Sequence, residues 1–324
     1  MPDISILMIT YNHGAFIAKA IEGVLLQQTN YSIELIIGED KSTDDTRKVC
    51  EAFAKKYPEK IKLLPSDYNY GMGKNFIRTM EACTGKYIAI CEGDDYWIDK
   101  NKLQTQVEFL EKNTTYSLCF HDIYHLAGNR KTNSGKWDAP DTSDINYLLT
   151  HRGYITTLSV VFRAHDSVIE FLNKAVNAPF LDFFVYVAVA QYGLLKFFPK
   201  KMGVYRVHDG GVWSKIGLIK ATEKMATGYR ILFAQISDAQ KEQLKIKYLT
   251  MLEDFFLNVG ITNITISDIE HLIITETGIQ PFMIEYIHQQ TIEQKKLSFF
   301  IKKVSIKKLI YAILYKIKKR YLVA

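Results

Sequence analysis

Two adjacent carboxylates, Asp94 and Asp95, follow an apolar run over residues 87–91 after only Glu92 and Gly93. A buried strand there would place both acids at its end, where two like charges are costly unless a cation joins them. Carboxylate and diphosphate oxygens together suit Mg²⁺ or Mn²⁺. The pair therefore predicts a divalent-metal site that also holds a diphosphate. The alternative is that one acid caps a helix beginning near Asn101 while the other faces water.

Asp40 stands in a similar place, after the apolar run of residues 35–38. Its carboxylate could accept a hydrogen bond from the ring N–H of a nucleobase, or it could have only a local structural role. A third polar segment, residues 71–75, contains two glycines and Lys74. Such a segment suits a loop that approaches a phosphate or the edge of a base. On its own it is more typical of an ordinary loop.

Each polar cluster needs an element that places it, and the hydrophobic periodicity indicates which. Strand-like runs alternate with helical spacing over residues 4–9, 15–28, 33–37, 44–57, 61–64, 74–83 and 86–91. Strands that alternate with helices form a parallel sheet, whose carboxyl ends share the edge where open α/β sheets bind ligands. Polar clusters follow all four strands, so we expect them to meet at this edge.

The second half of the chain has a less regular pattern. Two strands, a helix and a further strand are predicted over residues 116–122, 154–163, 182–192 and 195–207. After Lys215 the pattern is helical. The sequence thus predicts an α/β domain over residues 1–215, with a mostly parallel sheet flanked by helices. A helical C-terminal region over 216–294 and a basic amphipathic tail helix over 295–324 are expected to follow.

The order of the polar clusters carries a family resemblance. Thr10-Tyr11-Asn12 comes first, then Asp40 with residues 42–46, then residues 71–75, then Asp94-Asp95. This order resembles glycosyltransferase family 2, and residues 205–214 are similar to the closing motif of its bacterial members. The resemblance implies a GT-A nucleotide-diphospho-sugar fold, inverting transfer and a divalent metal, Mn²⁺ or Mg²⁺. The chain has no Arg-Trp pair of the kind that processive members carry, so a non-processive enzyme is expected.

The resemblance also implies roles for individual residues. Asp95 would be the main metal ligand and His208 a later one, although His208 could instead only structure a surface loop. Glu92 stands where many relatives have Asp and is left outside the metal shell. Asp40 would bind the base, usually uracil. The residues expected to bind the donor nucleotide are Thr10, Tyr11, Asn12, Asp40, Lys74 and Asp94.

The catalytic base implied by the resemblance is Asp182, because family members carry an acid one helix before the final strand. It is the only acid between Glu170 and Asp209. An Asp at this position is also typical of a helix N-cap. Five further histidines show no ligand-like spacing, so core or surface roles are favoured for His13, His121, His125, His151 and His165.

Charge is divided unequally along the chain. Ten of the 41 Lys and Arg residues lie after position 294, where there is no acid, so residues 1–294 hold 31 bases and 35 acids. A mildly acidic body argues against nucleic-acid binding. On a helical wheel the tail has an apolar arc from Ile306 to Tyr321 opposite several lysines, which is typical of a helix lying on an anionic membrane. Packing of this helix on protein is the alternative.

The four cysteines form no CxxC pair, and reduced thiols point to the cytoplasm. The first residues contain only a short apolar run without a basic start, so no signal peptide is expected. We therefore expect a cytoplasmic enzyme, peripheral at the inner face of the plasma membrane. It would transfer one sugar from a nucleotide-diphospho-sugar, a UDP-sugar, to a hydroxyl of a glycan or lipid-linked glycan. The alternatives are a sugar-phosphate nucleotidyltransferase and a non-catalytic sugar- or lipid-binding module on the same fold.

Overall fold

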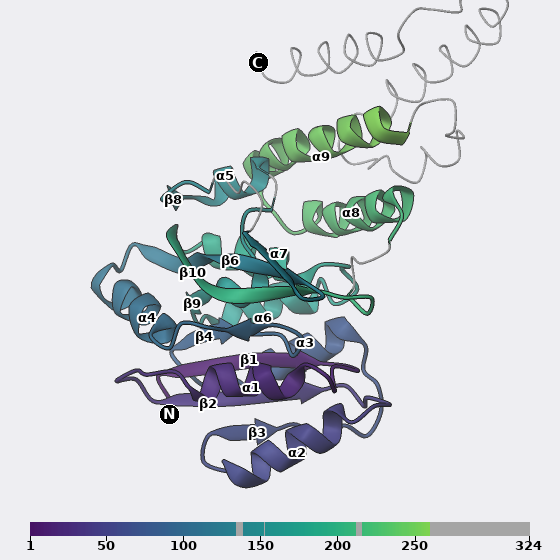
Figure 1. The fold of residues 1–324 in the computed structure, drawn as a ribbon. Coiled ribbons are helices and arrows are strands. Elements are labelled where there is room, and N and C mark those ends of the chain that lie inside the picture. Colours follow the sequence, from purple (N-terminus) through teal and green to yellow (C-terminus); the bar gives the residue numbers. More distant parts are fainter. Residues whose placement is uncertain (134–138, 152, 212–215, 260–324) are drawn as a thin grey trace, which may run out of the picture. The chain divides into compact units, whose positions relative to one another are not determined.

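The computed structural model describes residues 1–133, 139–151, 153–211 and 216–259 (Figure 1). The chain divides into two compact units, Met1–Ser214 and Lys215–Ala324. The described part of the second unit consists of α8 (Leu218–Phe233) and α9 (Asp238–Val259). The predicted tail helix over residues 295–324 and residues 260–294 of the predicted helical region lie outside the described residues, so those boundaries remain predictions.

The first four strands of unit one form a parallel half-sheet in the order β3-β2-β1-β4. Three helices connect them, with α1 and α2 over the near face of the sheet in Figure 1. The predicted alternation is confirmed, with the bounds β1 (Ile4–Thr10), α1 (Ile17–Leu25), β2 (Ile33–Glu39), α2 (Thr46–Lys56), β3 (Ile61–Leu63), α3 (Met72–Glu81) and β4 (Tyr87–Ile90).

The remaining strands extend the sheet with mixed directions, in the order β4-β9-β6-β10-β5, while β7 pairs with β6 and β8 with β10. Strands β6 and β10 are parallel to each other, and β9 is antiparallel to both β4 and β6. The elements are β5 (Tyr96–Trp97), α4 (Lys102–Lys112), β6 (Tyr116–Ala127), β7 (Arg130–Asn133), β8 (Thr142–Ser143), α5 (Ile145–Thr150), β9 (Val161–Arg163), α6 (Asp166–Asn173), α7 (Leu181–Ala190) and β10 (Leu194–Val207).

The strand predicted over residues 154–163 is largely wrong. Only β9 forms a strand there, and a 3-10 helix, Thr157–Ser159, precedes it. The chain must turn before β9, because β9 enters the sheet antiparallel between β4 and β6. This turn brings Thr157 to the edge of the sheet where β4 ends, as the contacts of Thr157 below show.

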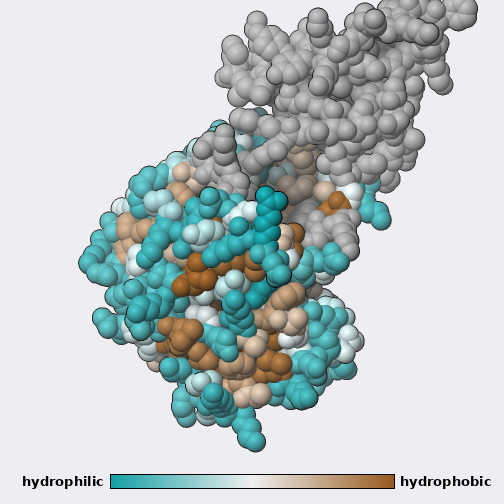
Figure 2. Space-filling model, viewed as in Figure 1, coloured by the Kyte–Doolittle hydropathy of each residue, from teal (hydrophilic) through white to brown (hydrophobic). Residues whose placement is uncertain are grey.

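The core explains why these segments form strands and helices. Strand β1 is buried along almost its whole length, so both of its faces are apolar, whereas α1 buries only one face. Trp97 anchors the short strand β5 to this core, since its indole N–H donates to the carbonyl of Leu158 at 2.8 Å. On the face shown in Figure 2, apolar patches of unit one lie between hydrophilic side chains. Among the described residues, no helix is both long enough and apolar enough to span a bilayer.

Candidate active site

Asp94 lies between two histidines at the carboxyl edge of the sheet. Its Oδ2 is 3.0 Å from Nε2 of His208 and 3.7 Å from Nε2 of His13. The three residues follow β10, β4 and β1, so three strand ends converge here. Phe16 packs against both imidazoles, at ring-centroid distances of 4.8 Å from His208 and 6.4 Å from His13. The predicted site residues Asp94 and His208 are thus in direct contact.

These three side chains offer ligand atoms for a divalent metal. One ligand atom from each of His13, Asp94 and His208 lies within 4.8 Å of the others. Burial raises the pKa of Asp94, but the hydrogen bond with His208 and the proximity of His13 outweigh burial, so this pKa is lowered. Burial lowers the pKa of His13. Both shifts favour the deprotonated forms that bind metals, and a set of two imidazole nitrogens and one carboxylate suits Mn²⁺ better than Mg²⁺.

Asp95 is not a member of this cluster. It is 1% exposed, and its Oδ1 accepts a hydrogen bond from the N–H of Arg206 at 2.8 Å. Its Oδ2 has no hydrogen-bond partner among the described residues. Burial and the neighbouring acids Asp94 and Glu92 raise the pKa of Asp95 well above its ordinary value. Asp95 therefore joins β10 to the acidic motif, and only its Oδ2 is left for a cation.

Asn12 connects the turn after β1 to the turn after β2. It adopts a left-handed backbone with φ of +55°, and its N–H donates to Oγ of Ser42 at 2.9 Å. In return, the N–H of Thr43 donates to Oδ1 of Asn12 at 2.8 Å. Asparagine tolerates this backbone conformation better than most residues. The neighbouring Tyr11 remains 45% exposed, so its ring is open to a ligand.

Asp40 lies beside the same turn. Its N–H donates to the carbonyl of Thr10 at 3.0 Å, and its Oδ1 accepts from the N–H of Tyr70 at 2.7 Å. Both Asp40 and Thr10 are almost completely buried, at 3% and 2% exposed. The structure thus brings Thr10, Asn12 and Asp40 together as the sequence predicts, and it assigns one oxygen of Asp40 to the loop before α3.

In the segment of residues 71–75, the packing of α3 requires the second glycine, Gly73. A Cβ on Gly73 would lie 2.0 Å from the carbonyl oxygen of Val176, so only glycine allows α3 to approach that loop. Gly71 has φ of +78° just before the helix, a conformation that also favours glycine. Lys74 is exposed in the first turn of α3. Lys74 is therefore the charged candidate of this segment for contact with a ligand, and Met72 lines the cavity described next.

A cavity of about 380 Å³ lies beside the cluster, and Asp182, Glu92 and Asp94 are among its lining residues. The Oδ2 of Asp182 accepts a hydrogen bond from Oγ1 of Thr157 at 3.2 Å. Helix α7 begins at Leu181 with Phe180 in the cap position, so the alternative role of Asp182 as an N-cap is wrong. Burial, with Asp94 and Asp182 nearby, raises the pKa of Glu92 well above its ordinary value.

The sequence does not predict every residue of this site, and His125, expected in a core or surface role, also lines the cavity. His13 was assigned a core or surface role, yet it contacts Asp94 and His208. Its position directly after Thr10-Tyr11-Asn12, at a strand end, was a signal that could have identified it. Glu92 was left outside the metal shell, and the structure places it in the cavity wall with Asp182 instead.

The family model described as Glycosyl transferase family 2 matches residues 5–167. The protein named UDP-Glc:alpha-D-GlcNAc-diphosphoundecaprenol beta-1,3-glucosyltransferase WfgD, from Escherichia coli, is 29% identical over 255 residues, which cover 79% of this chain and 87% of WfgD. An uncharacterized protein of Mycobacterium bovis is 33% identical over 210 residues, or 64% of this chain. The match spans only 60% of the length of that mycobacterial relative.

The fold has solved counterparts. Residues 1–349 of TarS from S. aureus, in complex with UDP-GlcNAc, superpose with a TM-score of 0.58 at 13% identity, covering 94% of this chain and 95% of that one. At this identity the likeness concerns the fold, which is the GT-A glycosyltransferase fold predicted from the motifs. With the family match, it follows that the chain belongs to glycosyltransferase family 2.

Proposed function

We propose that this glycosyltransferase is inverting, metal-dependent and non-processive, and that it moves one sugar from a UDP-sugar to a hydroxyl of a glycan or lipid-linked glycan. The observation that carries the proposal is the cavity in which Asp182 and Asp94 both line the wall, with His13 and His208 in contact with Asp94. A single displacement needs a base for the acceptor and a cation for the leaving group near one another. The name of WfgD and the UDP-GlcNAc in TarS support a UDP-sugar as donor.

In this proposal Asp182 accepts the proton of the acceptor hydroxyl as that oxygen attacks the anomeric carbon. The hydrogen bond from Thr157 to Oδ2 of Asp182 would orient the carboxylate. Asp94, His13 and His208 would hold a divalent metal. When bound, this metal would neutralise charge on the departing diphosphate. Asp95, the main metal ligand predicted from the sequence, remains a candidate only through its Oδ2.

The donor nucleotide would lie over the turns that follow β1 and β2. The exposed ring of Tyr11 would stack on the base, and the second carboxylate oxygen of Asp40 would accept from the uracil N–H. The backbone at Thr10 and Asn12 would line the nucleoside pocket. Lys74, exposed at the start of α3, would contribute a positive charge toward the phosphates.

We place the enzyme in the cytoplasm, at the inner face of the membrane. The support is the sequence of residues 295–324, which combines ten basic residues and no acid with an apolar arc. A lipid-linked glycan acceptor would be reached most directly from that position.

The first experiment measures thermal stability with UDP, dTDP and GDP, each with and without Mn²⁺. A ligand that binds only the folded state raises the unfolding midpoint. We expect the largest shift with UDP and Mn²⁺ together. In a second assay with a panel of UDP-sugars, we expect slow hydrolysis of one member of the panel. Formation of a nucleotide-sugar from a nucleoside triphosphate and a sugar 1-phosphate would instead identify a nucleotidyltransferase. Absence of any metal-dependent shift would favour a non-catalytic module.

A further inference from the structure

The ribbon formed by β10, β6 and β7 continues outward from the cavity. His125 on β6 is in register with Tyr205 on β10, and Ala127 is in register with Arg130 on β7. Partners in register point to the same face of a sheet, and alternate residues along a strand share a face. Arg130 therefore lies on the same face as His125 and Tyr205.

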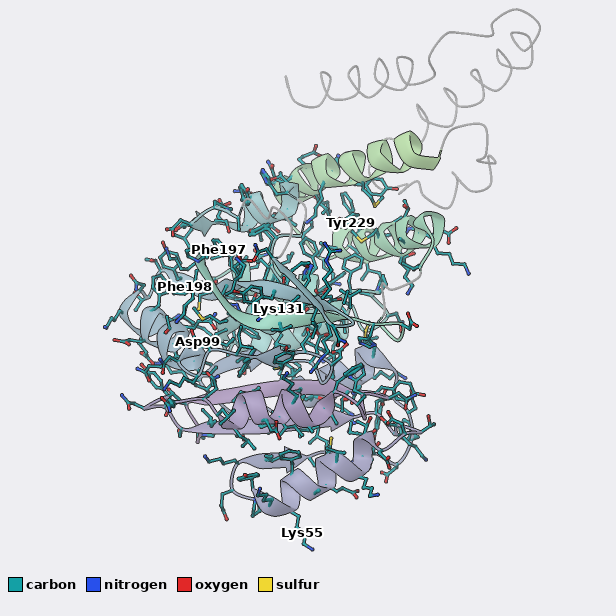
Figure 3. The ribbon with its side chains drawn as sticks, viewed as in Figure 1. Lys55, Asp99, Lys131, Phe197, Phe198 and Tyr229 are labelled. Atoms are coloured by element: carbon teal, nitrogen blue, oxygen red, sulfur yellow. The ribbon has the colours of Figure 1, made fainter. Side chains whose placement is uncertain are left out.

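Contacts confirm which face this is. His125 and Tyr205 both line the cavity that contains Asp182, and their rings pack with centroids 5.5 Å apart. Lys131, labelled in Figure 3, belongs to the opposite face, where its amino group lies 3.9 Å from the ring centroid of Tyr124. The two adjacent cations of β7 are thus directed to different sides of the ribbon.

The side chain of Arg130 is exposed, and its guanidinium forms no hydrogen bond or ion pair with any residue that the structure describes. The nearby acid on β6, Asp122, lies on the other face and binds Lys201. By strand geometry, the Cα atom of Arg130 is roughly 8 Å from that of His125. No residue that the structure describes neutralises this guanidinium, and its backbone position is about one sugar length from the aromatic pair.

These two features match two parts of one ligand. The two rings are tilted by 56° to each other, so they form an angled apolar wall on which the C–H face of a sugar can rest against one ring, as in mostly apolar pockets with few polar groups. A guanidinium presents N–H donors in a planar fork that binds phosphate oxygens in pairs. A sugar on Tyr205 and His125 would carry a phosphate at its anomeric oxygen within reach of Arg130.

We propose that the acceptor is a glycosyl phosphate or diphosphate, whose sugar rests on Tyr205 and His125 beside Asp182 and whose phosphate is bound by Arg130. This inference rests on the proposed function and specifies the acceptor class for the same cavity. It makes Arg130 a specificity-determining residue, because a neutral glycoside would gain nothing from it.

The test compares two probes that differ by the diphosphate group: GlcNAc diphosphate esterified with a decyl chain, and the neutral decyl glycoside of GlcNAc. Dissociation constants are measured with UDP and Mn²⁺ present. The wild-type protein should bind the diphosphate probe at least about tenfold more tightly, in line with one charge-assisted hydrogen-bonding group. Arg130→Gln should abolish this difference, and Arg130→Lys should retain part of it.

Lys131→Gln is the matched control, since it removes the same charge one residue away on the other face, and it should retain the full preference. Equal effects of Arg130→Gln and Lys131→Gln, or no preference in the wild-type protein, would overturn the inference. A weaker affinity of Arg130→Gln for UDP itself would assign the phosphate to the donor and would overturn it as well. Failure of the wild-type protein to bind UDP with Mn²⁺ would refute the proposed function instead.

Discussion

At the scale of single residues, three acids of one short motif have three different surroundings. Glu92 lines the cavity, Asp94 contacts two imidazoles, and Asp95 accepts a hydrogen bond from the backbone of Arg206. The chain turns directly after β4, so successive side chains leave it in different directions. Adjacent carboxylates in the sequence therefore need not share one ion.

This difference predicts unequal effects on metal binding. Asp94→Asn and His208→Ala should each remove most of the Mn²⁺-dependent thermal shift observed with UDP, because each deletes one atom of the ligand cluster. Asp95→Asn keeps the oxygen that accepts from Arg206 and should retain at least about half of the shift. If Asp95→Asn lost the whole Mn²⁺-dependent shift while Asp94→Asn kept most of it, Asp95 would be the main metal ligand.

The role of Asp182 predicts a loss confined to the chemical step. Asp182→Asn should lower turnover by about a hundredfold or more, because the amide cannot take the acceptor proton, while the affinity for UDP stays within about threefold. Turnover is measured with saturating donor and affinity by calorimetry. Asp166→Asn, an exposed acid at the start of α6, is the control and should be silent. Parallel losses of turnover and donor affinity would make Asp182 a donor-site residue.

At the scale of elements, the first residue of helix α4 is a buried lysine, Lys102. Lys102 is 0% exposed, and its Nζ has no hydrogen-bond partner among the described residues. Its amino group lies 4.1 Å from the centroid of the Trp97 ring. Among the described contacts, this cation–π contact offsets part of the cost of burying the charge. Burial lowers the pKa of Lys102 from its ordinary 10.5 to about 7.

This lysine predicts that stability rises with pH. Between pH 7 and 10.5 the unfolded chain binds the proton and the folded chain releases it, so the free energy of unfolding gains up to about 1.4 kcal/mol per pH unit from this residue. Lys102→Met should remove that rise and stabilise the protein by about 1–4 kcal/mol at pH 6. Urea unfolding at pH 6 and 9 measures both effects.

Lys100→Met is the matched control, because Lys100 is exposed two residues earlier, and it should change stability by less than about 0.5 kcal/mol at either pH. If Lys102→Met left the pH dependence of unfolding intact, another group would have to carry it.

At the scale of the whole molecule, the chain has a mildly acidic body and a basic tail. Residues 1–294 carry a net charge of −4, and residues 295–324 carry ten bases without an acid. An acidic body is repelled by an anionic bilayer, so binding to such a surface should depend on the tail.

A chain ending at Gln294 should therefore lose sedimentation with anionic vesicles while it still transfers sugar to a short water-soluble acceptor. Added salt should weaken the binding of the full chain only in part, because screening acts on the lysines and not on the apolar arc. Vesicles of neutral lipid serve as the control. Continued sedimentation of the shortened chain, or its aggregation, would show that the tail packs on protein.

The sequence by itself determined the parallel half of the sheet and the place of its site. Buried strands such as β1 and β4 are continuous apolar runs followed by polar residues, and this signal is local. The parallel topology then brings Thr10, Asp40 and Asp94 to one edge without further information. The family motifs depend on that same order, which is why they identified the fold.

Tertiary structure alone decided the contacts between distant segments. His208 meets Asp94 across 114 positions, and Gly73 is required only by the carbonyl of Val176. The antiparallel insertion of β9 likewise turned a predicted strand into a 3-10 helix that presents Thr157 to Asp182. Strand register and packing between elements fix such contacts, and neither leaves a periodic trace in the local sequence. For the same reason, only the pairing of β6 with β7 and β10 could place Arg130 on the face of the cavity.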